Sequence, residues 1–347
     1  MTPSVPQLVI SASLVLAACL GCDSASQPNQ APASIDTLST APTQPAIAQP
    51  PRESAGPTAG PTTATNDIGP AEWAALEQCG ARIKRGPDGR IRELDLRKCA
   101  FTNSDLGGLA TLADLRVLKL AGGDNGTTVD DDGLVHCAGL RQLRVLTLDR
   151  LWVSEVGLAR LQDLTQLEEL YLAATLVGDE VLPLLPQFPR LTKLRLAKSQ
   201  LSGKGLAHLA SLSQLRELDL SEMSQLGDDD MAELAHISTL TRLNLWRVPI
   251  TDEGIRHLRD LTQLEWLNLD NTRLSDAGLV HLQPLTRLRY LHAGSTAITD
   301  EGLAALQPLT SLRDLNVSRT SVTPNGADEL QKTMPQVKLQ LEYLGPS

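Results

Sequence analysis

Histidine and aspartate residues recur at set places in this sequence, and both residue types can bind metal ions. Histidine nitrogens are common zinc ligands, and carboxylates are the usual calcium ligands. Four histidines share a recurring phrase of the Gly-Leu-x-His-Leu kind: His136, His208, His257 and His281. Because each phrase recurs only after at least one full repeat, we interpret these histidines as surface residues. The aspartate runs 130–132 and 228–230 lack the spacing of an EF-hand loop. We interpret them as helix starts, with calcium binding as the alternative, and we predict no metal site and no cofactor.

Other constellations that support catalysis are missing from the sequence. There is no Ser/His/Asp order, no glycine-rich nucleotide loop and no pair of acids in a pocket-forming domain. The formal net charge of −10 argues against a nucleic-acid partner, which needs clustered lysine and arginine. We therefore expect a protein that is not an enzyme and does not bind nucleic acid.

From residue 91 onward the chain repeats a unit of about 24 residues with the pattern L-x-x-L-x-L-x-x-T-x-I-T-D-x-G-L-x-x-L-x-x-L-T-x. The units open at Ile91, Leu115, Leu143, Leu167, Leu191, Leu215, Leu240, Leu264, Leu288, Leu312 and Gln336. Two units deviate in length, the one from Leu115 and the one from Leu215. The pattern resembles leucine-rich repeats, and these repeats are similar to those of ribonuclease-inhibitor-like and F-box proteins. The resemblance implies an α/β solenoid of about eleven units, with parallel strands on the concave face and short helices on the convex face.

The positions within a unit have distinct physical roles. Leucines at positions one, four and six are expected to point inward and to meet those at positions sixteen, nineteen and twenty-two. Residues 264–269 exemplify the strand and residues 276–282 the helical segment. A threonine column, for example Thr272, can satisfy backbone groups at the turn. Pairs such as Ser275 and Asp276 can cap the helical segment, and the glycine two residues later indicates a tightly packed turn.

A cap is predicted before the first unit, over residues 71–90. Residues 71–78 have helical spacing, with Trp73 and Leu76 on one face, and residues 86–89 predict the turn of a hairpin. This cap and the repeats resemble leucine-rich repeat proteins common in planctomycetes and related bacteria, from residue 71 to the end of the chain. We expect a disulfide between Cys79 and Cys99 and a buried free thiol at Cys137.

The N-terminus has the features of an export segment. Residues 8–18 are apolar, and Leu16-Ala17-Ala18-Cys19 resembles the lipobox of bacterial lipoproteins. The resemblance implies a signal peptide over 1–18, lipid attachment at Cys19 and an exported protein anchored to a bacterial membrane, in the periplasm or at the cell surface. The alternative is an ordinary signal peptide with an incidental cysteine. Residues 19–70, rich in Pro, Ala and Thr, predict a disordered tether, and residues 91–347 form the repeat domain.

Aromatic residues and arginines are concentrated on the predicted strands of the seventh to ninth units. In a chain with only 3% aromatic residues, this clustering favours a binding hot spot over the strand preference of aromatics alone. We predict a contiguous partner-binding surface with Trp266 exposed at its centre, arginines at its rim and a pH-sensitive histidine. Its members are Arg242, Trp246, Arg247, Trp266, Asn268, Asp270, Tyr290 and His292.

These features favour a binding module that is not an enzyme, anchored to a membrane, with its concave face holding a protein or, as a weaker option, a polysaccharide. One alternative is a structural envelope protein that associates with its own copies. Another is an exported effector-like protein.

Overall fold

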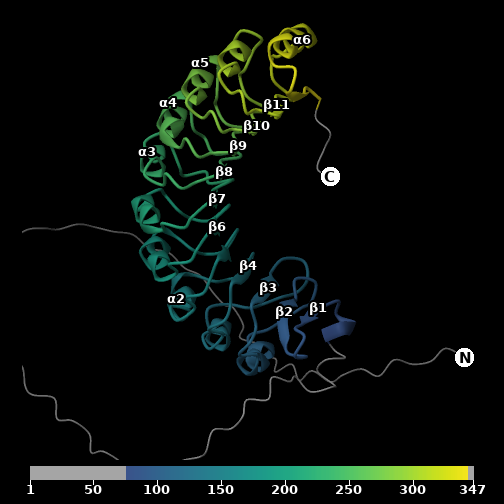
Figure 1. Ribbon diagram of the computed structural model, residues 1–347. Coiled ribbons are helices and arrows are strands. Elements are labelled where there is room, and N and C mark those ends of the chain that lie inside the picture. The colour runs from purple at the N-terminus through teal and green to yellow at the C-terminus, as the bar shows by residue number, and fades with distance from the viewer. Residues whose placement is uncertain (1–75, 343–347) are drawn as a thin grey trace, which may run out of the picture. The chain divides into compact units, whose positions relative to one another are not determined.

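The computed structural model describes residues 76–342, which all belong to one compact unit of the chain. The predicted signal peptide, lipidation site and tether lie outside these residues, as does most of the predicted cap helix, of which residues 76–78 are described and helical. Strands line the inner side of a curved solenoid and short helices line its outer side (Figure 1). The fold is a leucine-rich repeat solenoid, as the 24-residue period predicts.

The sheet has twelve strands in sequence order. Strand β1 pairs antiparallel with β2 across the predicted hairpin turn, and each later strand pairs parallel with its predecessor. The strands are β1 Arg82–Arg85, β2 Ile91–Asp95, β3 Val117–Ala121, β4 Val145–Asp149, β5 Glu169–Tyr171, β6 Lys193–Arg195, β7 Glu217–Asp219, β8 Arg242–Asn244, β9 Trp266–Asn268, β10 Tyr290–His292, β11 Asp314–Asn316 and β12 Lys338–Gln340.

Short α and 3-10 helices form the convex side. They are η1 Ser104–Thr111, η2 Gly133–Cys137, α2 Glu155–Ala159, η3 Asp179–Gln187, η4 Leu206–Ser211, α3 Met231–Leu234, α4 Asp252–Arg256, η5 His257–Asp260, α5 Asp276–Leu279, η6 Val280–Leu282, η7 Gly302–Leu306 and α6 Pro324–Thr333. Most span only one or two turns, because each must return the chain to the next strand within one repeat.

The core consists of stacked leucines between the sheet and the helices. In the unit that opens at Leu264, Leu267 of β9, Leu269 just beyond it and the convex residues Leu279 and Leu282 are all fully buried. Equivalent leucines of neighbouring strands lie in register. Burying one leucine stabilises the fold by roughly 1.5–3 kcal/mol, and the same positions recur in every unit. The predicted inward columns are confirmed.

Position eight of each unit from the third to the tenth adopts a left-handed backbone conformation without being glycine. The eight residues are Arg150, Ala174, Lys198, Glu222, Arg247, Asn271, Ser295 and Arg319, with φ between 53° and 60°. Such a conformation costs roughly 1–2 kcal/mol for an ordinary residue. From the third to the ninth unit, the N–H of this residue donates to a carbonyl of the next unit, as from Arg150 to Ala173 at 2.8 Å. The backbone ladder therefore continues past the short strands, and its hydrogen bonds offset the strain.

A second ladder joins the convex sides of successive units through aspartate. Asp276 accepts hydrogen bonds from the N–H and the hydroxyl of Thr299 in the next unit, at 2.8 and 2.7 Å. Thr299 in turn accepts from the N–H of Glu301, which caps the following helical turn. The predicted hydroxyl caps are confirmed, but the carboxylate binds the next unit instead of its own helix. The aspartates of this aspartate ladder are Asp131, Asp179, Asp228, Asp252, Asp276 and Asp300.

The glycine column makes room for this ladder. A Cβ atom on Gly302 would lie 2.1 Å from the Oδ1 atom of Asp276, and one on Gly278 would lie 2.2 Å from the Oδ1 atom of Asp252. Real Cβ atoms do not approach so closely. The predicted tight packing is confirmed, and its cause is the carboxylate of the preceding unit.

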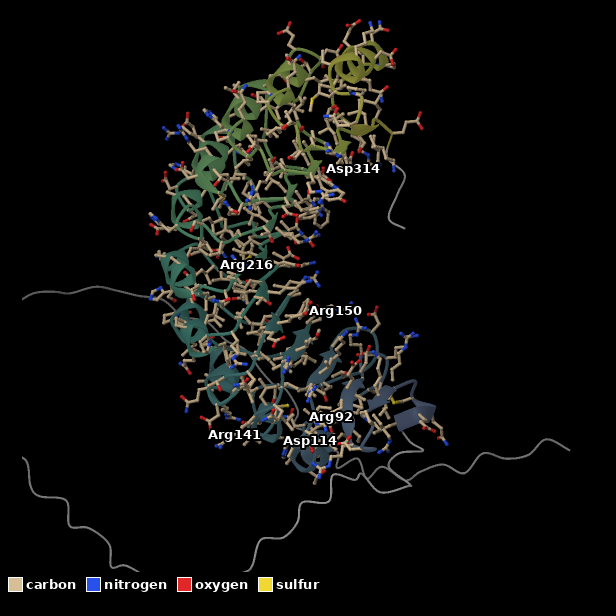
Figure 2. The ribbon with its side chains drawn as sticks, in the orientation of Figure 1. Arg92, Asp114, Arg141, Arg150, Arg216 and Asp314 are labelled. Atoms are coloured by element: carbon tan, nitrogen blue, oxygen red, sulfur yellow. A yellow bond between two sulfur atoms is a disulfide. The ribbon has the colours of Figure 1, made fainter. Side chains whose placement is uncertain are left out.

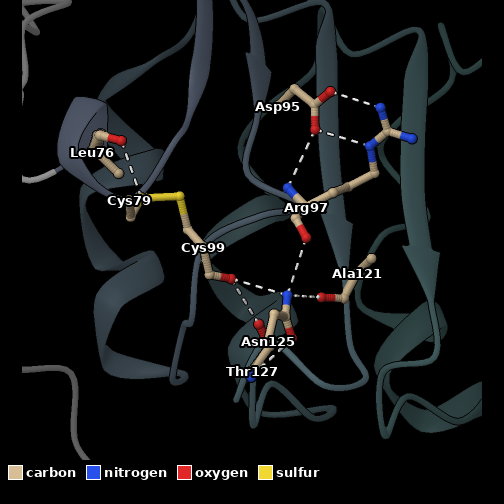
Figure 3. Close-up of a disulfide and its surroundings, with 8 residues drawn as sticks. All are labelled: Leu76, Cys79, Asp95, Arg97, Cys99, Ala121, Asn125 and Thr127. Carbon is tan, nitrogen blue, oxygen red and sulfur yellow. Dashed lines mark hydrogen bonds and ion pairs between the residues drawn. A yellow bond between two sulfur atoms is a disulfide. The ribbon is translucent and has the colours of Figure 1, made fainter.

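A disulfide ties the cap to the turn that follows β2 (Figure 3). Cys79 and Cys99 are bonded, with their Cα atoms 5.0 Å apart. Beside this bond, the Asn125 side chain donates to the carbonyls of Cys99 and Ala121 at 3.1 and 2.9 Å. Asn125 belongs to the long second unit, so its extra residues hold the turn that carries Cys99. Cys137 is a free, buried thiol, and burial raises its pKa to about 12.

Candidate functional site

The concave face presents the side chains at positions three and five of each unit. These positions alternate with the buried leucines, because successive strand side chains point to opposite faces. In the middle of the face the two columns carry charges in alternation. Lys193 and Glu217 form an ion pair at 3.0 Å, and the guanidinium group of Arg195 bridges Asp149 and Asp219 at 2.9 and 3.1 Å.

Towards the C-terminus the charged columns give way to a cluster that we call the aromatic patch: Arg242, Trp266, Tyr290 and His292. Arg242, Trp266 and Tyr290 are register partners on three successive strands. The Arg242 guanidinium lies 4.6 Å from the Trp266 ring centre, and the His292 ring lies 5.6 Å from it. Tyr290 is 39% exposed. The structure thus brings these four predicted residues together.

Trp266 itself is half-buried, which differs from the exposed position predicted for it. Arg242 and His292 cover its ring from the two neighbouring strands. Arg242 also faces Glu217 of β7 at 3.7 Å, so it forms the edge of the patch towards β7. The strand spacing of about 4.8 Å brings such large side chains into contact. The sequence pattern indicates which face of the sheet a residue lies on. It does not indicate how much of that residue's side chain the neighbouring side chains cover.

The remaining predicted members have different surroundings. Trp246 lies beyond the end of β8. The equivalent residue in the next unit is Asp270 and not Trp266. The prediction that three aromatics share adjacent strands is wrong for Trp246, because the strands have only three residues there and the chain turns at Arg247. The Arg247 guanidinium covers the Trp246 ring at 5.3 Å and faces Glu222 at 3.7 Å.

The side chains of Asn268 and Asp270 accept hydrogen bonds from backbone N–H groups. The Asn268 side chain accepts from the N–H of Asp270 at 2.9 Å, and the Asp270 carboxylate accepts from the N–H of Gly294. The Asp270 carboxylate also faces the Nδ1 atom of His292 at 3.9 Å. Burial raises the pKa of Asp270 above its usual value, against the opposing effects of the Gly294 hydrogen bond and of His292.

The acidic runs have structural roles. Asp131 and Asp228 belong to the aspartate ladder, and Asp132 forms an ion pair with Arg160 at 3.0 Å. Within residues 76–342, no three histidine, cysteine or acidic side chains form a group suited to a metal ion.

Sequence reasoning missed a second feature of the concave side, at its N-terminal end. A hollow of about 630 Å³ lies there, beside the cap and the strand ends of the first units, and we call it the N-terminal hollow. Its charged lining residues are Arg82, Asp95, Arg97, Lys98, Asp149, Arg150, Arg195, Lys198 and Glu222. These residues are dispersed over more than 140 positions, so no local motif marks them. The residues at position eight of successive units were the signal in the sequence that could have indicated this hollow. Sequence reasoning also missed Trp152, which is 70% exposed and lies before α2, off the strands.

No protein-family model matches the sequence, and the comparison with curated proteins gives no match. Among solved structures, the chain is similar to an internalin, InlF, of Listeria monocytogenes, with 22% identity and a TM-score of 0.49 over 69% of this chain and 71% of that one. Internalin C2 of the same organism has 21% identity and a TM-score of 0.44 over 78% and 92%. The leucine-rich repeat ectodomain of the receptor kinase GASSHO1/SCHENGEN3 from Arabidopsis thaliana, solved in complex with Casparian strip integrity factor 2, has 15% identity and a TM-score of 0.45 over 73% and 30%.

In residues 76–342, no helix combines the length and the apolar character that crossing a membrane requires.

Proposed function

We propose that this chain is a binding module, not an enzyme, which holds a protein partner on the concave face of its solenoid through the aromatic patch. The observation that carries the proposal is the contact of Arg242 and His292 with the Trp266 ring, beside the exposed ring of Tyr290. Arginine, tryptophan and tyrosine dominate binding hot spots. Neighbouring strands hold these side chains in place, so binding needs to order little of the surface.

The test compares capture of proteins from the envelope fraction of the source cells by the full chain and its variants. Truncating a hot-spot residue typically costs about 2 kcal/mol or more, which is roughly thirtyfold in affinity. Trp266→Ala and Tyr290→Ala should each lose the same protein, identified by mass spectrometry, while circular dichroism stays unchanged.

Trp152→Ala is the matched control, because it removes an exposed tryptophan outside the strands. Capture that survives Trp266→Ala and fails with Trp152→Ala would refute the concave site. If the chain captures chiefly its own copies, a self-associating scaffold replaces the binding module.

We also propose that Cys19 carries a lipid that anchors the exported chain to a bacterial membrane. The lipobox-like sequence 16–19 supports this, and the disulfide between Cys79 and Cys99 is the kind of bond found in an oxidising compartment. A diacyl anchor binds a membrane stably, whereas one acyl chain binds only marginally.

Cys19→Ser should change both the membrane fractionation and the mass of the chain, because the lipid is no longer attached. Cys22→Ser, three residues away, is the control and should change neither. An unchanged distribution and mass for Cys19→Ser would contradict lipidation at this residue.

A further inference from the structure

The N-terminal hollow is rich in positive charge within a chain of net charge −10. Six of its lining residues are cationic and three are acidic. Asp95 pairs with Arg97 at 2.8 Å, Asp149 with Arg195 at 2.9 Å, and Glu222 with Arg247, from outside the hollow, at 3.7 Å. Every carboxylate of the hollow therefore has a cationic partner.

Four cations of the hollow are left over. Arg82, Lys98, Arg150 and Lys198 are exposed, and within the described residues none of them forms an ion pair with a carboxylate, although, against the burial that raises the pKa of Asp149, the charge of Arg150 acts to lower it. Four like charges around one hollow repel each other, and an anionic ligand would relieve this repulsion. Arg150 lies on the inner side of the solenoid (Figure 2).

The backbone sets the spacing of two of these cations. Arg150, Ala174 and Lys198 occupy position eight of three successive units, and the backbone ladder hydrogen-bonds each of these units to the next. At about 4.8 Å per strand, the backbones of Arg150 and Lys198 lie roughly 10 Å apart. Ala174 lies between them in the column, Ala173 and Ala197 form an apolar floor, and the Arg150 guanidinium lies beside Gly123 of the second unit.

This arrangement fits an extended peptide. A chain that rises 3.3 Å per residue covers the roughly 10 Å between the two backbones in three residues, so acidic side chains three or more residues apart can reach both cations. The three carboxylates in the lining would repel a dense polyanion such as a sulfated polysaccharide. A peptide instead brings backbone N–H groups, from which these carboxylates can accept hydrogen bonds.

We infer that the N-terminal hollow binds an acidic segment of a protein partner through Arg150 and Lys198, with Arg82 and Lys98 at its cap side. This inference rests on the proposed function, because the segment would belong to the protein held on the concave face. It places a second contact N-terminal to the aromatic patch on that face, with a different chemistry.

The test titrates the full chain, in buffer of low ionic strength, with a fluorescein-labelled eight-residue peptide in which Asp and Glu alternate with Ala and Ser. The same peptide with Asn and Gln, and heparin as a sulfated polysaccharide, are the comparison probes. The acidic peptide should bind and its amide counterpart should not, and added salt should weaken the binding because it screens exposed charges.

Arg150→Gln combined with Lys198→Gln should weaken acidic-peptide binding about tenfold, since exposed ion pairs contribute up to about 1 kcal/mol each. The matched control combines Arg190→Gln with Lys204→Gln, two exposed cations outside the hollow. Ala174→Glu should also abolish binding, because it places a carboxylate between the two cations. It serves as the second variant if the double substitution disturbs folding.

No binding of the acidic peptide, equal binding by the hollow and control variants, or preferential binding of heparin at Arg150 and Lys198 would each overturn the inference. Trp266→Ala should leave peptide binding unchanged. A failure of the aromatic patch to capture a protein is therefore distinguishable from a failure of the hollow.

Discussion

Asp270 shows how a residue chosen for its position on the concave face can serve the fold. Its carboxylate is half-buried between the Gly294 N–H and the His292 ring, and burial raises its pKa. A raised folded-state pKa means that the folded protein favours the neutral acid. The favourable contribution is therefore complete below the unfolded-state pKa near 3.9 and is lost as the pH rises through the folded-state value.

The direction of this pKa shift predicts the effect of replacing Asp270 by Asn. Asn keeps a side-chain oxygen that accepts from Gly294 but carries no charge at any pH. We expect Asp270→Asn to raise the melting temperature at pH 7 and to lose that advantage as the pH approaches 3.9. Thermal unfolding by circular dichroism between pH 3.5 and 8 measures this, and a variant that is less stable than the wild type at pH 7 would show that the His292 contact outweighs burial.

At the scale of elements, each repeat is defined by the hydrogen bonds that join its helical turn to the next repeat, which we call the joint. The Ser/Thr-Asp-x-Gly phrase supplies a cap for its own helical turn, a carboxylate for the following unit and an open space for the carboxylate of the preceding unit. A hydroxyl and a backbone N–H share each carboxylate, so losing it leaves two donors without a partner.

The joint between Asp276 and Gly302 can be measured by a double-mutant cycle. Gly302→Ala should destabilise by about 2 kcal/mol or more through steric overlap with Asp276, and Asp276→Ala should cost about 1–3 kcal/mol through the lost hydrogen bonds to Thr299. In the double variant the main overlap is gone, so its cost should fall below the sum of the two single costs by about 1 kcal/mol or more.

Gly139→Ala is the control for this cycle, because nothing lies within 4 Å of the added methyl group. It should change the free energy of unfolding in urea by less than about 0.5 kcal/mol. Strictly additive effects of the two single changes would mean that the carboxylate moves aside freely.

The sequence predicted the elements well, because leucine spacing alone determines which strand face is buried. It predicted the disulfide pair and the burial of Cys137 from their places in the pattern. It did not predict that Trp246 lies outside a strand, because strand length depends on where the backbone turns at Arg247. The N-terminal hollow also escaped prediction. It depends on the left-handed column and on the hairpin, which bring residues as distant as Arg82 and Lys198 to one place.

At the scale of the whole molecule, each repeat contacts its neighbours and little else, so stability should approximate a sum over units and joints. The unit 264–287 can be removed without changing the phase of either ladder, because Asp252 would then face Thr299 instead of Ser275.

We expect deletion of residues 264–287 to leave a cooperatively folding solenoid of lower stability. Deletion of residues 264–285, which is two residues short of a unit, should disrupt both ladders at the junction and split or abolish the cooperative transition. Urea unfolding followed by circular dichroism distinguishes the two variants, and equal transitions would show that the phase of the ladders is unimportant.

Beyond the two ladders, the side chains at positions three and five join the units only through half-exposed ion pairs and ring contacts, such as that of Lys193 with Glu217, and such pairs contribute little stability. Backbone groups, inward leucines and the Ser/Thr-Asp-x-Gly phrase bear the structure, whereas Lys193, Arg242, Trp266 and Tyr290 stand on the concave side of an already complete frame. Natural selection can therefore change one face of this protein residue by residue while the fold stays under separate constraint. Descendants of one ancestral solenoid can in this way acquire different partners without passing through unfolded intermediates.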